Sequence, residues 1–229
     1  MANIKFSAIL SDVRGKLNGS IFSRNHYGPV IKTIFTPSNP HSTPQMTERN
    51  KVSELAAHWR ELSQSQRNAW YLLADELIKK NSVGEKKAPA GYNLFISHNL
   101  NLFNCAASEI DDANSDSFVD TFDYFYLTYS APPTFNINAN FPGFTTTLQG
   151  IYIIYATPSL SLGIRYVNCQ FRKIGVIPAG RVDFYSFSSA YYNVFGFPVS
   201  GMRIFVRLRP INSYSGFSGG ILQNYIDIP

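Results

Sequence analysis

The side chains best suited to binding chemistry lie near the N-terminus, where basic and aromatic residues are interleaved. Cationic side chains neutralise phosphates and aromatic rings stack on bases, so nucleic-acid-binding segments use such a mixture. Four basic residues over positions 14–32 are a modest density, however, and no recognition-helix motif accompanies them. Two partners therefore stay open, a nucleic acid and another protein subunit. The residues that we predict to contact the partner are Lys16, Phe22, Arg24, Tyr27, Lys32 and Phe35.

No arrangement of residues in the sequence predicts catalysis or a bound metal. The four histidines fall in a turn, a linker and two helices, without an HExxH pattern or a cysteine at metal-ligand spacing. The acidic residues between 109 and 123 lack the spacing of a calcium loop. The glycines of residues 215–220 follow a strand but open no helix, which favours a hairpin or bulge over a phosphate loop. We therefore predict that the protein is not an enzyme and has no cofactor.

The positive charge is concentrated in the first part of the chain. The 229 residues carry a net charge of +5. Residues 1–95 hold 13 Lys and Arg against 7 Asp and Glu, a net charge of +6, whereas residues 96–229 hold 7 against 8, a net charge of −1. A basic front part fits docking to an acidic surface or a nucleic acid, and fits an ordinary solvated surface at least as well.

Cysteine usage and hydropathy favour a reducing compartment. Cys105 and Cys169 are 64 positions apart, and we expect them to be two buried free thiols. No apolar run approaches the roughly 18 residues of a membrane helix. Residues 1–16 lack the apolar core and cleavage site of a signal peptide. The protein is expected to be made in a cytoplasm and to stay there until assembly.

The basic and aromatic residues belong to an extended arm, predicted over residues 1–44. Strand-like residues 20–24 and 29–35 flank a four-residue turn that ends with Gly28 at a positive φ. Three prolines in residues 36–44 then predict an irregular connector. Because a two-stranded hairpin is marginal in water by itself, the arm is expected to lie on another surface.

A small helical domain is predicted over residues 45–105. Thr43 is the expected N-cap with Pro44 at the first helical position, and Ser63 with Gln66 predicts a capping box for a second helix. Apolar residues at three- and four-residue spacing form two stripes. These stripes are Val52, Leu55, Ala56, Trp59 and Leu62, followed by Ala69, Trp70, Leu73, Ala74 and Leu77.

A third helix over residues 89–103 completes this predicted core. The two tryptophans are expected to meet across the first two helices as core residues rather than as a binding site. The acidic residues 106–117 are interpreted as a solvated linker. The third helix is expected to supply Tyr92, Phe95, Leu102 and Phe103 to the core.

From residue 118 to residue 229 the hydrophobic period changes to two. Alternating runs separated by Pro, Gly, Asn and Ser predict an antiparallel β-sandwich of the immunoglobulin type. This part contains no Trp, which argues against a true antibody-type domain. Its predicted strands are 124–130, 135–141, 150–156, 165–177, 182–188, 202–210 and 224–228. One aromatic group is either core, which we favour, or a glycan-binding surface of a host adhesin: Tyr185, Phe187, Tyr191, Tyr192 and Phe195.

The first half of the chain carries a series of motifs that resembles virion structural proteins of tailed phages, especially phages of Bacteroidetes hosts, including crAss-like phages. The motif residues are Gly15-Lys16, Gly19-Ser20, Phe22-Ser23-Arg24-Asn25, Gly28, Thr36-Pro37, Asn39-Pro40, Arg49, Trp59-Arg60, Leu62, Gln66-Arg67, Ala69-Trp70 and Gly91-Tyr92-Asn93-Leu94-Phe95. Residues 203–219 resemble the F strand and F–G loop of fibronectin type III modules. Most of these phage proteins have Arg where this chain has His26 or Ile31, which weakens a direct contact with DNA.

Together, these observations predict an α+β multidomain protein with an N-terminal β-hairpin arm, a small helical domain and a C-terminal immunoglobulin-like β-sandwich. The resemblance implies a non-enzymatic role in the virion, as a capsid decoration protein or a head–tail connector ring. The arm would add strands or backbone hydrogen bonds to a capsid, portal or neck subunit. A symmetric homo-oligomer is expected, without membrane contact. The alternatives are a DNA-associated virion protein and the adhesin.

Overall fold

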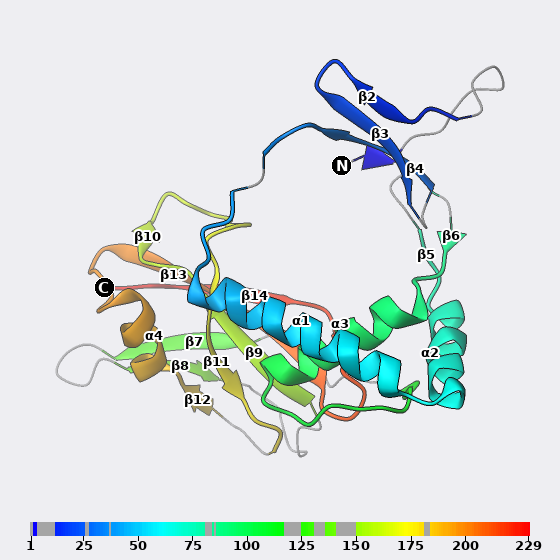
Figure 1. Cartoon of the computed structure of the whole chain (residues 1–229). Helices are drawn as coiled ribbons and strands as arrows, with labels where there is room; N and C mark the ends of the chain where they lie inside the picture. The colour runs from blue at the N-terminus through cyan, green and yellow to red at the C-terminus, as the bar shows by residue number, and fades with distance from the viewer. Residues whose placement is uncertain are drawn as a thin grey trace. The chain divides into compact units, whose positions relative to one another are not determined.

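The computed structural model of the chain describes residues 2–3, 12–25, 28–36, 38–80, 84, 86–116, 125–130, 136–140, 150–180 and 184–229 (Figure 1). These residues form helices and antiparallel sheets, which confirms the fold class at the level of mixed α and β structure. They fall into two compact units. Unit 1 comprises residues 1–96 and 111–113, and unit 2 comprises residues 97–110 and 114–229. The domain limits predicted at residues 44, 105 and 118 differ from this division and stay predictions.

The N-terminal arm in unit 1 is a four-stranded antiparallel sheet, not a lone hairpin. Its strands are β1 (Ala2–Asn3), β2 (Gly15–Leu17), β3 (Ser20–Asn25) and β4 (Gly28–Thr33), in the order β1-β4-β3-β2 (Figure 1). The predicted pairing of β3 with β4 is confirmed, and it continues to Asn25 opposite Gly28, closer to the turn than predicted. Gly28 has the expected positive φ, at 111°.

Turn chemistry explains the additional hairpin of the arm. Asn18 and Gly19 join β2 to β3 with φ angles of 40° and 78°. A two-residue Asn-Gly turn with both φ angles positive matches the twist of paired strands, so it closes a hairpin between β2 and β3.

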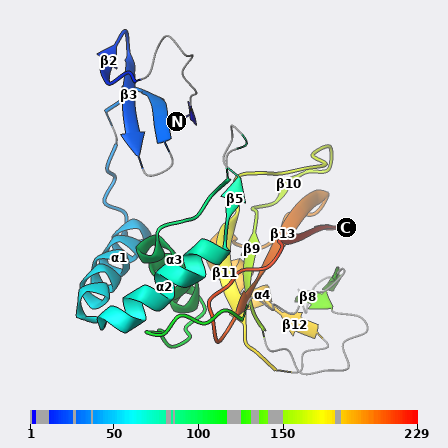
Figure 2. The same cartoon turned by 90° about the vertical axis from the view of Figure 1, so that its right-hand side faces the viewer.

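Three helices follow the arm: α1 (Thr43–Glu61), α2 (Gln64–Glu76) and α3 (Gly91–Asn104), seen together in Figure 2. Ser42, not the predicted Thr43, occupies the N-cap position of α1, and its side chain makes no capping hydrogen bond. The capping box of α2 is confirmed. The Gln66 backbone N–H donates to Ser63 Oγ at 3.3 Å, and the Ser63 backbone N–H donates to Gln66 Oε1 at 3.0 Å.

The core of unit 1 is aromatic. Leu55, Trp59 and Trp70 are buried on the two predicted stripes. Phe95, from the start of α3, packs on both indoles, with ring centroids 5.2 Å from Trp59 and 5.5 Å from Trp70. The two tryptophans are therefore core residues, as their helical spacing predicted, and both contact the same phenyl ring.

Some predicted members of this core lie elsewhere. Val52 is 38% exposed, whereas the neighbouring Lys51 is buried and forms an ion pair with Glu54 across 3.3 Å. Leu102 is buried in unit 2, and Phe103 is 37% exposed. The sequence pattern thus predicted the positions of the helices more accurately than it predicted which faces of α1 and α3 are buried.

Unit 2 contains two antiparallel sheets. The five-stranded sheet consists of β9 (Gly150–Ala156), β10 (Leu160–Ser161), β11 (Arg172–Ile177), β13 (Met202–Asn212) and β14 (Leu222–Asp227). Within it, β13 pairs with β9, β10 and β14. The three-stranded sheet consists of β7 (Tyr126–Ser130), β8 (Asn136–Asn140) and β12 (Phe184–Ser186), in the order β12-β8-β7.

Both sheets of unit 2 contribute to one hydrophobic core. Alternate residues of β13, namely Ile204, Val206 and Leu208, are buried in it, together with Ile137 and Ala139 of β8. Successive side chains of a strand point to opposite faces. Arg203, Phe205, Arg207 and Arg209 therefore lie on the face of β13 turned away from this core.

Two segments of unit 2 differ from the prediction. The predicted strand 165–177 forms only from Arg172, because Gln170 has a φ of 75°, which an extended strand does not allow. Residues 165–171 are irregular. The helix α4 (Ser188–Phe195) was not predicted, since its eight residues include three aromatic side chains of high strand propensity.

Ordered contacts replace the expected solvated linker over the described residues of 106–117. In unit 2, Asn99 Nδ2 donates to Ile110 O at 3.1 Å and its Oδ1 accepts from Ile110 N at 2.8 Å. The Ser215 hydroxyl donates to Asp116 O at 2.6 Å. Side-chain hydrogen bonds to backbone thus fix this acidic segment.

The two cysteines are free, but only one of them is buried. Cys105 packs with Ile151, Ile153 and Ile211, whereas Cys169 is exposed, so the prediction of two buried thiols is wrong for Cys169. Burial raises the pKa of the Cys105 thiol to about 11. None of the helices in the described ranges is long and apolar enough to cross a membrane.

Gly216 is expected to be indispensable for the stability of unit 2. Its φ is 71°, and a Cβ added there would lie 2.5 Å from His98 O in α3. Gly216→Ala should therefore lower the free energy of unfolding by about 2–4 kcal/mol, from backbone strain and overpacking. Gly220→Ala is the matched control, because its Cβ would meet nothing within 4 Å. Chemical denaturation measures both, and equal stability of the two variants would contradict this packing.

The thiols are expected to differ in reactivity. At pH 8, iodoacetamide should modify Cys169 in the folded protein and leave Cys105 intact, because only about one in a thousand Cys105 thiols is ionised and the side chain is covered. Both should react in denaturant. Peptide mass spectrometry reads the result, and modification of Cys105 as fast as Cys169 at pH 8 would be inconsistent with its burial.

Candidate interaction surface

Strand pairing sorts the predicted contact residues of the arm onto two faces. Lys16 pairs with Ile21, which pairs with Lys32, so both lysines lie in one row on one face. Phe22 and Arg24 occupy alternate positions of β3 and lie on the other face. The interleaved basic and aromatic stripe expected from the sequence is therefore divided between two surfaces.

The face that carries Phe22 is the more apolar one. Phe22 pairs with Ile31, and Leu17 lies on the same side, because it pairs with Ser20 two residues before Phe22. Leu17 is 61% exposed, whereas Phe22 and Ile31 are half-buried. We call Leu17, Phe22 and Ile31 the apolar arm face.

The connector after the arm adds two exposed apolar side chains. Ile34 is 43% exposed and Phe35 is 74% exposed, and both precede the proline-containing segment. Phe35, a predicted contact residue, thus lies outside the sheet and is open to solvent. Tyr27, the remaining predicted residue, lies outside the described residues.

The described part of the arm sheet buries very little apolar surface of its own. Among the hydrophobic side chains described in β1 to β4, Val30 alone is almost fully buried, at 1% exposure. Strands need a shared hydrophobic face, or another element to pack against, for independent stability. The arm therefore presents apolar groups that a further surface would cover.

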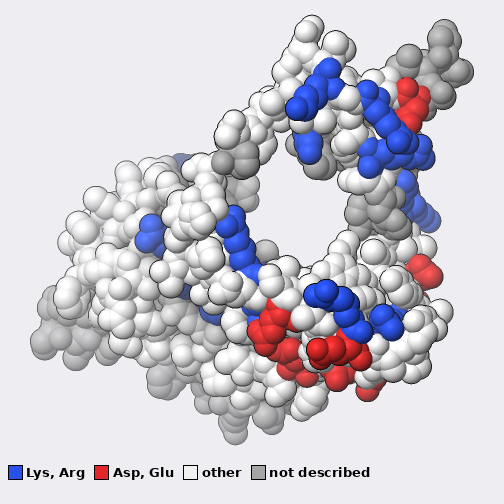
Figure 3. Space-filling model, in the orientation of Figure 1, with Lys and Arg blue, Asp and Glu red and all other residues white. Residues whose placement is uncertain are grey.

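Unit 1 contains a second cationic element, which the sequence pattern did not predict. Two short strands, β5 (Lys79–Lys80) and β6 (Lys86–Lys87), pair antiparallel, and every residue in them is lysine. We call this pair the lysine ribbon. Figure 3 shows Lys and Arg gathered over the arm sheet and the ribbon. The signal in the sequence was two Lys-Lys pairs that flank a turn.

The lysine ribbon places like charges opposite one another. Lys79 pairs with Lys87, and Lys80 pairs with Lys86. Like charges directly opposite one another, as on Lys80 and Lys86, are destabilising. Lys87 Nζ also lies 3.4 Å from the position that a Cβ at Gly28 would take, so the ribbon adjoins the start of β4. An anionic partner would relieve this repulsion.

Several residues of the recognised motifs have structural roles. Arg49 Nη1 donates to Asn39 Oδ1 at 2.8 Å, which ties the connector to α1. A Cβ on Gly91 would lie 2.8 Å from the Tyr71 ring and 3.1 Å from the Trp70 backbone, so only glycine allows α3 to begin this close to α2. With the Trp59 and Trp70 core, these contacts indicate that much of the motif series specifies the fold.

The aromatic residues considered for an adhesin surface belong to the core of unit 2. Phe187 and Tyr191 are almost fully buried, and Tyr185, Tyr192 and Phe195 pack against the same cluster. Burial raises the pKa of the Tyr191 phenol to about 12. These side chains are thus core residues and do not form the predicted alternative binding surface.

The described histidines and acidic residues do not converge on a metal site. Within the described ranges, no group of three or more His, Cys, Asp or Glu side chains could hold a metal ion. His58 pairs with Asp111 at 3.0 Å inside unit 1, and His98 packs edge-on against Phe217 in unit 2, with ring centroids 4.4 Å apart. Their observed contacts are structural.

Comparisons with known proteins found no match for the chain among family models, curated proteins or solved structures.

Proposed function

We propose that the chain is a structural protein of a tailed-phage virion, as a capsid decoration protein or a ring protein of the head–tail neck. The observation that carries the proposal is the arm sheet, which buries Val30 but leaves Leu17 and the connector residue Phe35 mainly exposed in the described chain. The motif series between residues 15 and 95, which resembles virion proteins of Bacteroidetes phages, supports the same role. The protein would be made in the host cytoplasm and end in the particle.

In this proposal, the arm is the docking element. A neighbouring capsid, portal or neck subunit covers the apolar arm face and Phe35, and the edge strand β2 offers backbone groups for strand addition. Lys16, on that short edge strand, disfavours unspecific pairing with other sheets. Burying one Leu or Phe side chain contributes about 1.5–3 kcal/mol, and a symmetric assembly repeats this contribution at every copy.

Residues 118–229 would form an immunoglobulin-like or fibronectin type III-like sandwich that faces outward or contacts another layer. Two antiparallel sheets that share one hydrophobic core support this part of the proposal. The arm would then attach the protein to the particle, and the sandwich would be the part displayed on it.

Copy number in purified particles tests the virion role. Quantitative mass spectrometry against the major capsid protein should give on the order of a dozen copies for a neck ring, or hundreds for a decoration lattice, as closed symmetry requires. Absence from particles purified through a density gradient would refute the role.

The exposed apolar side chains of the arm are expected to drive incorporation. Leu17→Ser with Phe35→Ser should lower the copies per particle at least tenfold when the variant competes with wild-type protein, because two buried anchors are lost. Neither side chain is needed for folding, since both are mainly exposed. Leu72→Ser with Ile78→Ser removes equally exposed apolar groups outside the arm. Equal incorporation of both double variants would show that the arm is not the docking element.

A second candidate function is contact with nucleic acid in the virion, which the lysine ribbon favours. Lys80 and Lys86 of the ribbon, with Lys16 and Lys32 on the arm, form an array without a described carboxylate partner, and phosphates would neutralise it. This binding would depend on the charge of the phosphates and not on the base sequence of the nucleic acid.

Lys86→Glu distinguishes this candidate. The substitution places a carboxylate opposite Lys80, which favours the ribbon, while it removes a phosphate contact. Affinity for double-stranded DNA should fall about threefold to tenfold more than with Arg60→Glu, which makes the same charge change on α1. Wild-type affinity should fall steeply with salt, by a slope of about −0.9 per phosphate contacted. No retention on DNA at low salt would rule this role out.

A further inference from the structure

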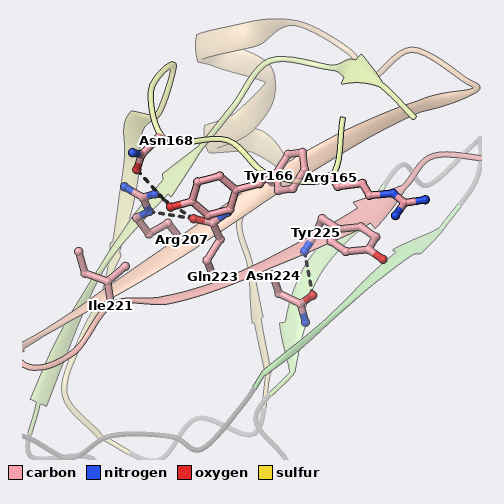
Figure 4. Close-up of a pocket in the computed structure, with 9 residues that line it drawn as sticks. Arg165, Tyr166, Asn168, Arg207, Ile221, Gln223, Asn224 and Tyr225 are labelled. Carbon is pink, nitrogen blue, oxygen red and sulfur yellow. Dashed lines mark hydrogen bonds between the residues drawn. The ribbon is translucent and has the colours of Figure 1, made fainter. Parts of the chain in front are cut away.

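A groove lies on the face of the five-stranded sheet that is turned away from the core of unit 2. It has a volume of about 600 Å³ and lies between β13 and β14 on one side and the irregular segment 165–168 on the other (Figure 4). An adjoining hollow of about 340 Å³ shares Asn168, Arg207 and Ile221 with it. Cavities of roughly 300–1,000 Å³ are typical of small-ligand sites.

The groove exists because the rest of this face is covered. At one end of the face, Cys105 and Ala107 pack on Ile151, Ile153 and Ile211. At the other end, no described segment fills the space above Arg207, and residues 165–171 line it instead of forming the predicted strand. The irregular segment thus builds one wall of the groove.

Arg203 has a carboxylate partner and is structural. Its Nε and Nη2 atoms donate to Asp227 Oδ1 and Oδ2, at 2.5 Å and 2.8 Å, and its guanidinium lies 3.9 Å from the Tyr225 ring centroid. The guanidinium holds the pKa of the Asp227 carboxyl below its usual range. This pair fixes the Tyr225 ring at the edge of the groove.

Arg207 is held in place without being neutralised. Its Nε and Nη2 atoms both donate to Gln223 Oε1, at 3.3 Å and 2.9 Å, and its guanidinium lies 4.0 Å from the Phe171 ring centroid. No carboxylate in the described residues forms an ion pair with Arg165, Arg207 or Arg209. The terminal Nη1–Nη2 edge of Arg207 therefore keeps its parallel N–H donors, which match the two oxygens of a carboxylate.

Flat and amide-bearing side chains surround this fixed cation. Tyr166 is 69% exposed and Tyr225 is 47% exposed, and both line the groove. Tyr166 Oη donates to Asn168 Oδ1 at 3.3 Å, which leaves the two N–H donors of that amide available (Figure 4). Tyrosine combines an apolar ring face with a polar tip, so a ring that is apolar on one side and hydroxylated at its edge fits between these groups.

We propose that this groove binds an acidic sugar residue, whose carboxylate lies on the Nη1–Nη2 edge of Arg207 and whose ring packs on a tyrosine. The amide of Asn168 and the guanidinium of Arg165 bind hydroxyl groups. A polyphosphate chain is a poorer fit, because residues 96–229 carry a net charge of −1, from 7 bases and 8 acids. The inference does not depend on the virion role.

The test is a titration of the full-length protein with a galacturonic acid oligosaccharide and with its methyl ester, which has the same rings without charge. Calorimetry should detect the acid and find at least tenfold weaker binding of the ester. Arg207→Met should weaken binding of the acid at least tenfold. Arg172→Met is the matched control and should leave affinity unchanged, because Arg172 also lies over a phenylalanine, Phe195, but outside the groove.

Cys169, exposed beside the groove, gives an independent readout that locates the ligand. The acidic oligosaccharide should slow alkylation of Cys169 in the wild type, and Tyr166→Ala should abolish both protection and binding. If Arg207→Met fails to fold, Tyr166→Ala still tests the proposal, because the Tyr166 side chain is mainly exposed. The proposal is overturned by no binding of the acid at 10 mM or by equal binding of acid and ester. It is also overturned if single-stranded DNA or an acidic peptide binds at Arg207 in preference to the sugar.

Discussion

The arm sheet has little buried apolar surface of its own. Four strands pair there, yet Val30 is the single hydrophobic side chain described in them that is almost fully buried. The helices of unit 1 and the sheets of unit 2 bury clusters around Phe95 and Ile204, respectively. Because hydrophobic burial dominates folding free energy, the arm is the segment whose stability has most to gain from a partner.

Where local chemistry decides, the structure was predictable from the sequence. The Ser63–Gln66 capping box and the apolar strand β9 formed as expected, because caps and short apolar runs act within a few residues. The positive φ of Gly28 follows the same logic, since the turn demands it.

Where tertiary context decides, the prediction was wrong or incomplete. Gln170 ends a strand pattern by its φ of 75°, and α4 forms from residues that favour strands because their aromatic side chains fill the core. The groove depends on two tertiary facts: segment 165–168 leaves the sheet, and Arg207 has no carboxylate partner in the described residues. The spacing of residue types along the sequence predicts neither of these two facts. The six predicted contact residues were placed on one arm but not on one face, since pairing register separates Lys16 from Phe22.

Hydrogen–deuterium exchange of the arm, in the free protein and in assembled particles, tests the central claim most directly. Amides of β3 and β4 should exchange quickly in the free chain, because local stability follows local burial, and at least a hundredfold more slowly in the particle. The helices α1 and α2, which have their own core, should change little. Equal exchange of the arm in both states would contradict the account, since it would mean that assembly leaves the apolar arm face uncovered.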